Sequence, residues 1–288
     1  MKWEEGDESG NIEDRRGLGP VAGVGGLGVG GVVLALIGYF VFGISPSTTL
    51  NAVDAGRDPT MPQQQQQQGV RGAPTDQGGR FVDVIATSVD EVWAQVFRQA
   101  GRTYRPPAAE VLYDRSTVTG CGLGQSAMGP FYCPQDHKVY LDLAFWQELD
   151  QRFGASGEAA RAYVIAHEMG HHVQTLLGQD RQARREGAQG AQSGSVRLEL
   201  QADCYAGVWA AHVSEVTGGK VALDPKDIED GLRAAAAVGD DTLQRETSGQ
   251  VVPDSFTHGT SAQRMRWFRA GVDSGDPAQC DTFGAARL

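Results

Sequence analysis

The sequence predicts a mainly helical α+β domain, preceded by one transmembrane helix. Helical patterns dominate the second half of the chain, strand-like runs cluster early in the domain, and an uncharged apolar stretch lies near the N-terminus. With 40% hydrophobic residues among 288, the chain can build a packed core. The formal net charge of −11 argues against nucleic-acid binding, because such proteins present a basic surface to phosphates.

The apolar stretch near the N-terminus is long enough to cross a bilayer. Residues 17–53 carry no charge, and residues 21–44 are apolar or glycine throughout. A helix needs about 20 apolar residues to span the hydrocarbon core. We therefore expect a transmembrane helix at 17–44. A cleaved signal peptide and a buried core helix are the alternatives.

Positive charges on either side of this stretch predict its orientation. Arg15 and Arg16 precede it directly, and the next base is Arg57. Basic residues favour the cytoplasmic side of a span. We therefore expect residues 1–16 to be a cytoplasmic segment and the domain that follows the span to be extracytoplasmic.

A change of composition separates this stretch from the domain. Residues 45–79 are rich in proline and glycine and contain a glutamine run at 63–68, which is typical of a disordered linker. Residues 80–288 have a globular composition and a length suited to one domain.

Caps and hydrophobic spacing predict the elements of this domain. Ser88 and Glu91 resemble a capping box at the start of a helix that Pro106 and Pro107 end. Gly178 is a helix stop for the long pattern that precedes it. In chain order we expect the helix from residue 88, strands at 111–113 and 139–143, and helices at 144–153, 157–177, 195–216, 224–237 and from 261 onward.

The motif that carries chemistry is His167-Glu168-x-x-His171. Histidines four residues apart lie on one face of a helix, so both imidazoles can reach the same Zn²⁺ ion. The adjacent Glu168 can take a proton from a water molecule on the metal. A chance match is the alternative, but the apolar residues before the motif favour a buried and rigid helix.

A catalytic zinc site usually has a third protein ligand. The best candidate is Glu199, because 32 residues after His167 leave room for a turn and a returning helix. One turn further on, Asp203 can accept a hydrogen bond from a ligand histidine. His212 and His258 are the competing ligands, and both acids could instead face solvent.

These motifs also resemble those of a known family. His-Glu-x-x-His followed by Glu-x-x-Ala-Asp resembles the glutamate-zincin metallopeptidases, and more narrowly the bacterial putative neutral zinc metallopeptidases (YpfJ-like). The resemblance implies a zincin-like peptidase domain without naming a substrate. The matching stretches are residues 11–17, 133–142, 162–174, 198–207 and 255–261.

The residues together predict a mechanism. Zinc held by His167, His171 and Glu199 would bind a water molecule and lower its pKa. Glu168 would accept the proton and pass it to the leaving amine. His258, in a glycine-flanked turn, is the candidate donor to the oxyanion, although a capping or surface histidine is an equal alternative.

Three other side chains have weaker roles. Tyr205 is a second, poorer candidate for the oxyanion donor, because it lies six residues after the glutamate ligand. His172 points about 100° away from the second ligand histidine and has a structural or supporting role. His137 receives no role.

Four cysteines are the remaining chemical groups. An extracytoplasmic domain permits disulfides, and the natural pairing is Cys121 with Cys133 and Cys204 with Cys280. Four cysteines allow three pairings, and the sequence does not choose among them. A second zinc site built from cysteines is the alternative, but no Cys-x-x-Cys spacing supports it.

The sequence thus predicts a membrane-anchored, zinc-dependent peptidase that hydrolyses protein or peptide substrates. The alternative is a tethered, zinc-containing binding or assembly module with little hydrolytic activity. The presence of Glu168 favours the enzyme, because a structural zinc needs no adjacent base.

Overall fold

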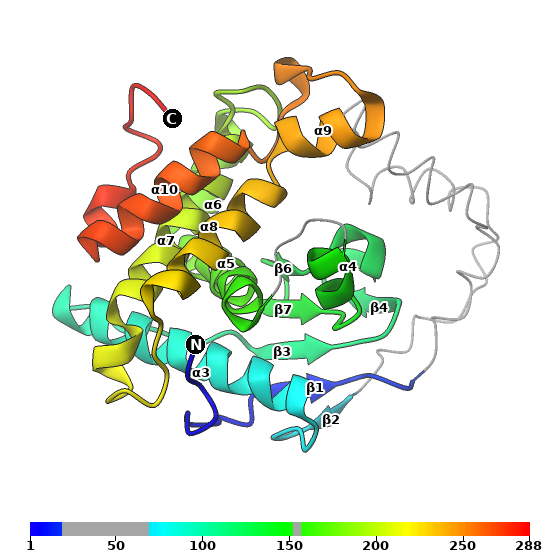
Figure 1. The fold of residues 1–288 in the computed structure, drawn as a ribbon, viewed down its shortest axis with the longest axis vertical. Helices are drawn as coiled ribbons and strands as arrows, with labels where there is room; N and C mark the ends of the chain where they lie inside the picture. Colours follow the sequence, from blue (N-terminus) through cyan, green and yellow to red (C-terminus); the bar gives the residue numbers. More distant parts are fainter. Residues whose placement is uncertain (19–68, 152–156) are drawn as a thin grey trace.

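The computed structural model describes residues 1–18, 69–151 and 157–288, and its fold is mainly helical α+β with a small early sheet, as predicted (Figure 1). The strands are β1 (Ile12–Asp14), β2 (Val70–Arg71), β3 (Ala109–Leu112), β4 (Ser116–Thr119), β5 (Gly122–Gln125), β6 (Phe131–Cys133) and β7 (Lys138–Leu141). The α-helices are α3 (Gln77–Gln99), α4 (Phe145–Gln151), α5 (Glu158–Leu177), α6 (Gln179–Arg185), α7 (Gly194–Val216), α8 (Pro225–Ala237), α9 (Asp240–Ser248) and α10 (Ser261–Ser274). Short 3₁₀ turns are η1 (Ser126–Met128), η2 (Pro253–Ser255) and η3 (Pro277–Cys280).

The main sheet has five strands in the order β2-β1-β3-β7-β6. Strand β3 pairs in parallel with β1 and β7, whereas the outer strands β2 and β6 are antiparallel to their neighbours. A separate hairpin joins β4 to β5. The sequence predicted β3 and β7 with boundaries shifted by one or two residues and missed the other strands, which are short and lack a clear alternation.

The N-terminal segment is part of this fold. Trp3 is only 2% exposed and its ring meets Phe81 of α3 edge-on, with centroids 5.1 Å apart. The ammonium group of Met1 lies 2.9 Å from Asp227 at the start of α8. Residues 1–16 therefore form part of the domain and are not the separate segment that the sequence predicted.

Charged side chains reinforce the attachment of β1. Glu13 is buried and bonds Arg15 at 2.8 Å and Lys138 of β7 at 2.7 Å. Burial alone would raise the pKa of Glu13, but the hydrogen bonds from Lys138 and Arg15 outweigh it and lower the pKa. The carboxylate of an inner strand thus ties the N-terminal segment to the strand two positions away.

The position of β1 also corrects the predicted topology. A single crossing by residues 17–44 would place residues 1–16 and the domain on opposite sides of a membrane, whereas they share one sheet. That orientation, with a cytoplasmic N-terminus and an extracytoplasmic domain, is therefore incompatible with this fold. Within the described ranges no helix is both long and apolar enough to span a bilayer, and the expected span lies outside them from residue 19 onward.

The boundary between linker and domain also shifts. Most of the expected linker, residues 45–68, lies outside the described residues. Its last part belongs to the fold, because β2 pairs with β1 and α3 begins at Gln77 behind the N-cap Asp76. Ser88 is no cap but sits inside α3, where its hydroxyl donates to the carbonyl of Ile85 and accepts from the indole of Trp209.

The helices around the site begin and end at local signals in the sequence. Gly178 takes the left-handed conformation, with φ of 79°, and ends α5 as predicted. Ser193 caps α7 through its side chain. Asp224 forms a capping box at α8, and Thr260 forms another at α10.

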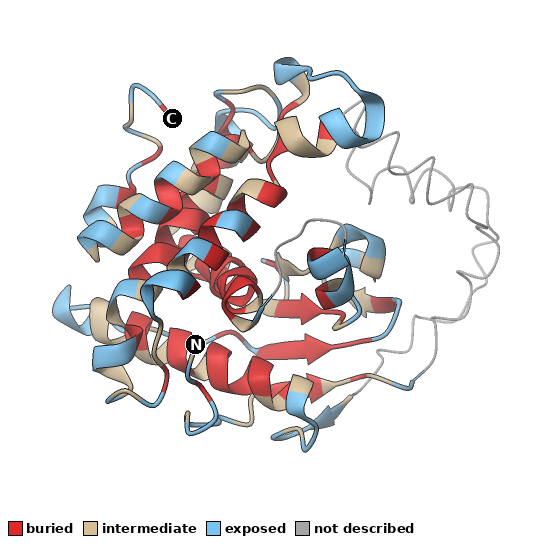
Figure 2. Cartoon of the chain, viewed as in Figure 1, coloured by how far each residue is buried: buried red, intermediate tan, exposed pale blue. Residues whose placement is uncertain are grey.

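Glycines let the central helices approach closely. A Cβ added at Gly170 of α5 would lie 3.2 Å from the backbone oxygen of Ala202 on α7. Where α7 crosses α10, a Cβ at Gly207 would lie 2.2 Å from the oxygen of Phe268. Figure 2 shows that the buried residues concentrate on the central helices, on α3 and on the inner strands of the sheet. Any larger side chain at these crossings would force the helices apart.

Both expected disulfides are present in the fold. Cys121 bonds Cys133 and ties the turn between β4 and β5 to the end of β6. Cys204 of α7 bonds Cys280 of η3 and ties the C-terminal tail to the helix that carries Glu199. The described residues contain no free cysteine, which leaves no thiol for the alternative of a cysteine zinc site.

The packing of the N-terminal segment makes a prediction about stability. Trp3→Ala in the full chain should lower the free energy of unfolding by about 3 to 5 kcal/mol, because it removes a large buried ring. Urea unfolding followed by circular dichroism measures the change. Glu5→Ala, at a position whose side chain is 72% exposed, is the matched control and should have little effect. An unchanged unfolding midpoint for Trp3→Ala would show that the segment lies outside the fold.

Candidate metal centre

Helix α5 supplies three of the predicted site residues. The apolar residues before His167 are buried, so this face of the helix is fixed in the core. His167 and His171 lie one turn apart with ring centroids 4.8 Å from each other. Glu168 lies in the same turn of the helix, and the residue is 8% exposed.

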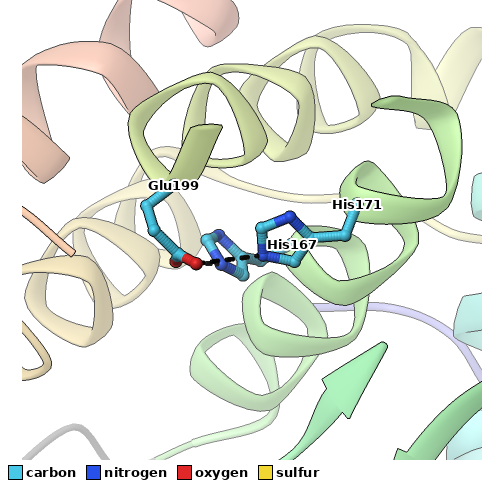
Figure 3. Close-up of side chains that lie close together, drawn as sticks. All are labelled: His167, His171 and Glu199. Atoms are coloured by element: carbon cyan, nitrogen blue, oxygen red, sulfur yellow. Dashed lines mark hydrogen bonds and ion pairs between the residues drawn. The ribbon is translucent and has the colours of Figure 1, made fainter. Parts of the chain in front are cut away.

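Helix α7 brings the third acid to this pair. Glu199 Oε2 lies 3.2 Å from His167 Nε2, and Glu199 Oε1 lies 3.5 Å from His171 Nε2. Figure 3 shows the three side chains pointing toward one another from the two helices. One ligand atom from each lies within 4.8 Å of the other two. The structure thus brings together the three residues predicted to bind zinc.

The donor set fits a catalytic zinc ion. Two imidazole nitrogens and one carboxylate oxygen are ligands that zinc takes, and three protein ligands leave one position open for water or substrate. Each ligand histidine makes a hydrogen bond through Nδ1, which leaves its Nε2 directed at Glu199. These histidines therefore present the nitrogens that a metal needs.

On the first ligand, the supporting group is Asp203. Its Oδ1 lies 2.8 Å from His167 Nδ1, as the sequence predicted, and also accepts from the hydroxyl of Tyr163. Arg264 of α10 donates two hydrogen bonds of 2.8 Å to the same carboxylate. Burial would raise the pKa of Asp203, but the charges of Arg264 and His167 outweigh it and lower the pKa. Asp203 is therefore a charged acceptor for the ligand.

Arg264 is buried, only 3% exposed, and its role was not predicted from the sequence. Nothing in its local pattern separates it from the neighbouring Arg266 and Arg269. It reaches Asp203 only because α10 crosses α7 at two glycines. The second ligand, His171, also has a supporting group that the sequence analysis did not predict. It is Gln174, whose Oε1 lies 2.8 Å from His171 Nδ1.

The predicted base, Glu168, has an environment suited to proton transfer. Burial, with the nearby negative charge of Glu199, raises the pKa of Glu168 to about 7, against the opposing charge of His167. A backbone hydrogen bond from Tyr132 of β6 also acts on the carboxylate. Glu168 therefore faces both the metal-ligand group and the outer strand of the sheet.

His258 lies at the same cavity, in the loop before α10. Its Nδ1 is 2.8 Å from the hydroxyl of Thr257 and 3.2 Å from Asp240 Oδ1. The other oxygen of Asp240 accepts the backbone N–H groups of Thr257, His258 and Gly259 at 2.7 to 3.0 Å. Sequence reasoning missed Asp240, which holds this loop in place from the start of α9.

The charge around His258 favours its protonated form. Burial lowers the pKa of His258, but the carboxylates of Glu199 and Asp240 outweigh it and raise the pKa. His258 does not belong to the metal-ligand group found among the described residues. This arrangement suits a hydrogen-bond donor better than a ligand.

The remaining candidates lie elsewhere. His212, the other competing ligand, bonds the carbonyl of Gly275 at 2.8 Å and supports the end of α10. The hydroxyl of Tyr205 bonds Gln179 at 3.0 Å, and its ring packs against Trp93. Neither side chain lines the cavity at the site.

His172 and His137 both contact the outer strand β6. The ring of His172 bonds the hydroxyl of Tyr132 at 3.1 Å and the carbonyl of Arg105 at 2.7 Å. His137 Nδ1 lies 3.0 Å from the same hydroxyl. His172 therefore has a supporting role, holding β6 against α5 beside Glu168.

The candidate site opens into a cavity of about 1000 Å³. The metal-ligand residues and Glu168 form part of its wall, β6 forms another part, and His258 lines it as well. Apolar side chains cover much of the remaining wall. They include Met128, Phe131, Phe145, Leu198, Leu243 and Val252.

The comparisons with known proteins agree with this geometry. The model of the family described as "putative neutral zinc metallopeptidase" matches residues 1–283. This chain belongs to that family. The family's name supports a zinc site, and the described residues contain a matching group of two histidines and one glutamate.

Relatives of this family member cover most or all of the chain. It is 45% identical over 300 residues to the uncharacterized protein YpfJ of Escherichia coli K12, covering 99% of each chain. It is 50% identical over 220 residues to the uncharacterized proteins Mb2605 of Mycobacterium bovis and Rv2575 of Mycobacterium tuberculosis, covering 73% of each chain. No solved structure matches the chain.

The contacts of Asp203 make a prediction about metal binding. Asp203→Asn should weaken zinc binding by about 10- to 100-fold, because the ligand loses a charged acceptor. It should also destabilise the fold by about 3 to 5 kcal/mol, because Arg264 keeps a buried charge without its counter-ion. Competition with a chromogenic chelator measures the affinity. Asp273→Asn, at an exposed position of α10, is the control, and equal affinities for the two variants would remove Asp203 from the site.

Proposed function

We propose that this protein is a zinc-dependent peptidase that hydrolyses peptide bonds in protein or peptide substrates. The observation that carries the proposal is the position of Glu168. Its buried carboxylate directly follows the ligand residue His167. It lines the same cavity as His167, His171 and Glu199. A zinc site that serves only structure has no use for a base at this place.

The residues have distinct parts in the reaction. When bound, zinc would supply the Lewis acidity that polarises a peptide carbonyl and makes water acidic at neutral pH. His167, His171 and Glu199 would hold it. Glu168 accepts a proton from the attacking water and delivers it to the nitrogen of the leaving amine.

His258 would stabilise the negative charge that develops on the carbonyl oxygen. Its ring lines the same cavity, and Asp240 fixes it through one side-chain contact and three backbone contacts to its loop. Because the loop is held before substrate arrives, stabilising the oxyanion with a donor at this position costs little reorganisation free energy.

Strand β6 offers a place for an extended substrate. Among the described strands it pairs only with β7, and it lies at the outer edge of the sheet beside Glu168. A peptide added along such an edge gains backbone hydrogen bonds while its alternate side chains enter pockets. The apolar wall of the cavity suits the apolar side chains of an unfolded polypeptide.

Membrane attachment stays part of the proposal. Residues 21–44 have the composition of a membrane segment, and the strand pairing adds the condition that residues 1–16 and the domain lie on the same side. Two disulfides are consistent with an extracytoplasmic compartment.

The proposed peptidase reaction makes a prediction about Glu168. The purified full chain should hold one zinc ion and cleave an unfolded protein, and removing the metal with a chelator should abolish cleavage. Glu168→Gln should keep the metal but lower kcat by about 100- to 10,000-fold, because the general base is lost. Glu215→Gln, at an exposed position of α7, is the control. Equal cleavage by Glu168→Gln and the unchanged chain would rule out the mechanism, whereas a zinc-loaded wild type without cleavage would favour the binding module.

A further prediction separates His258 from the metal ligands. His258→Ala should lower kcat by about 100- to 1000-fold, with zinc content unchanged, because it removes a donor to the oxyanion. His212→Ala is the matched histidine control, since that ring caps a helix away from the cavity. Loss of zinc from His258→Ala would instead make this histidine a ligand.

A further inference from the structure

A line of buried amide groups connects one ligand histidine to the C-terminal tail. His171 Nδ1 lies 2.8 Å from Gln174 Oε1, and Gln174 Nε2 donates to Gln201 Oε1 at 3.1 Å. Gln201 Nε2 in turn donates to the backbone carbonyl of Cys280 at 3.0 Å. Gln174, Gln201 and Cys280 are each no more than 2% exposed, so water does not compete for these bonds.

Two backbone carbonyls fix the direction of the hydrogen bonds along this line. A carbonyl only accepts, so Gln201 must turn its amide nitrogen to Cys280 and its oxygen to Gln174. Gln174 also donates to the carbonyl of Leu198 at 2.7 Å, which commits its nitrogen and leaves its oxygen for His171. The hydrogen of neutral His171 is therefore on Nδ1, and the lone pair of Nε2 faces Glu199.

The Cys204–Cys280 disulfide fixes the carbonyl on which this direction depends. Cys204 directly follows Asp203, the residue that accepts from Nδ1 of the other ligand, His167. The disulfide thus links the residues that support both ligands. Cys204 adjoins the group that supports His167, and Cys280 is the end of the hydrogen-bonded line that supports His171. Both sulfur-bearing residues are completely buried.

The tail has further contacts that hold it in place. The hydroxyl of Thr282 donates to the carbonyl of Arg197 at 2.6 Å, and Arg197 Nη1 donates to the carbonyl of Ala285 at 3.1 Å. Without the disulfide the tail would therefore retain a general position, while the carbonyl of Cys280 would lose its covalent restraint.

We propose that Gln174, Gln201 and the Cys204–Cys280 disulfide position His171 for metal binding. Affinity for the metal then depends on this disulfide and not on the Cys121–Cys133 disulfide, which joins the turn between β4 and β5 to the end of β6, away from the helices that carry the ligands. The inference rests on the zinc site of the proposed function, but not on peptidase activity.

The two disulfides provide a matched pair of variants. In the full chain, Cys204→Ala with Cys280→Ala should weaken zinc binding by about 10- to 100-fold, the usual effect of losing a group that orients a ligand. Cys121→Ala with Cys133→Ala should bind zinc as the wild type does. Chelator competition measures the affinities, and the absorption spectrum of the Co²⁺-loaded protein should change only in the first variant.

Gln201→Met tests the same path with both disulfides intact. It fills a similar volume but removes the donor to Cys280 and the acceptor for Gln174, and its zinc affinity should fall by about 10-fold. This variant decides the matter if the first double variant does not fold. Wild-type affinity in Gln201→Met would overturn the proposal, as would equal losses in the two disulfide variants. A wild type that binds zinc but cleaves nothing would refute the peptidase while leaving this inference intact.

Discussion

The close crossing of α5 and α7 is the constraint on which the site depends. Gly170 lies between the two ligand histidines, and it lets α5 approach the backbone of α7 at Ala202. At this separation Glu199 reaches both histidines and Asp203 reaches the first of them. A side chain at residue 170 would push α7 away and lengthen all of these contacts together. The ligands, their supporting groups and the core therefore share one packing surface.

Burial makes the charges around this crossing interdependent. Asp203 is completely buried, and a buried carboxylate needs counter-charges and donors to replace water. Arg264 and His167 provide them, and the arginine is available because α10 packs closely against α7. The second glycine crossing, at Gly207, is thus as necessary to the metal centre as the first.

More of the candidate site than of the fold could be predicted from the sequence. His167, Glu168 and His171 are recognisable because a helix turns their spacing into geometry, and Glu199 followed from the length of a helical return. Arg264, Asp240 and Gln201 were missed because their roles arise from tertiary contacts across 61, 18 and 79 residues. Their local patterns are those of ordinary helix and cap residues. The outer strands β2 and β6 were missed because they have only two and three residues, too few to show a period of two.

The N-terminal strand shows how a strong local signal misleads about the whole chain. Apolar residues 21–44 predict a crossing, and the preceding arginines predict its direction, but neither pattern contains the pairing partner of residues 12–14. That partner, β3, lies about a hundred residues later, and its parallel pairing leaves no turn in the sequence. Asp14 and Val70 are partners in the adjoining ladder, so both ends of the intervening segment meet at one place on the sheet. The compartment that permits the two disulfides must therefore also hold the N-terminal strand, because β1 is an inner strand and the sheet cannot be completed without it.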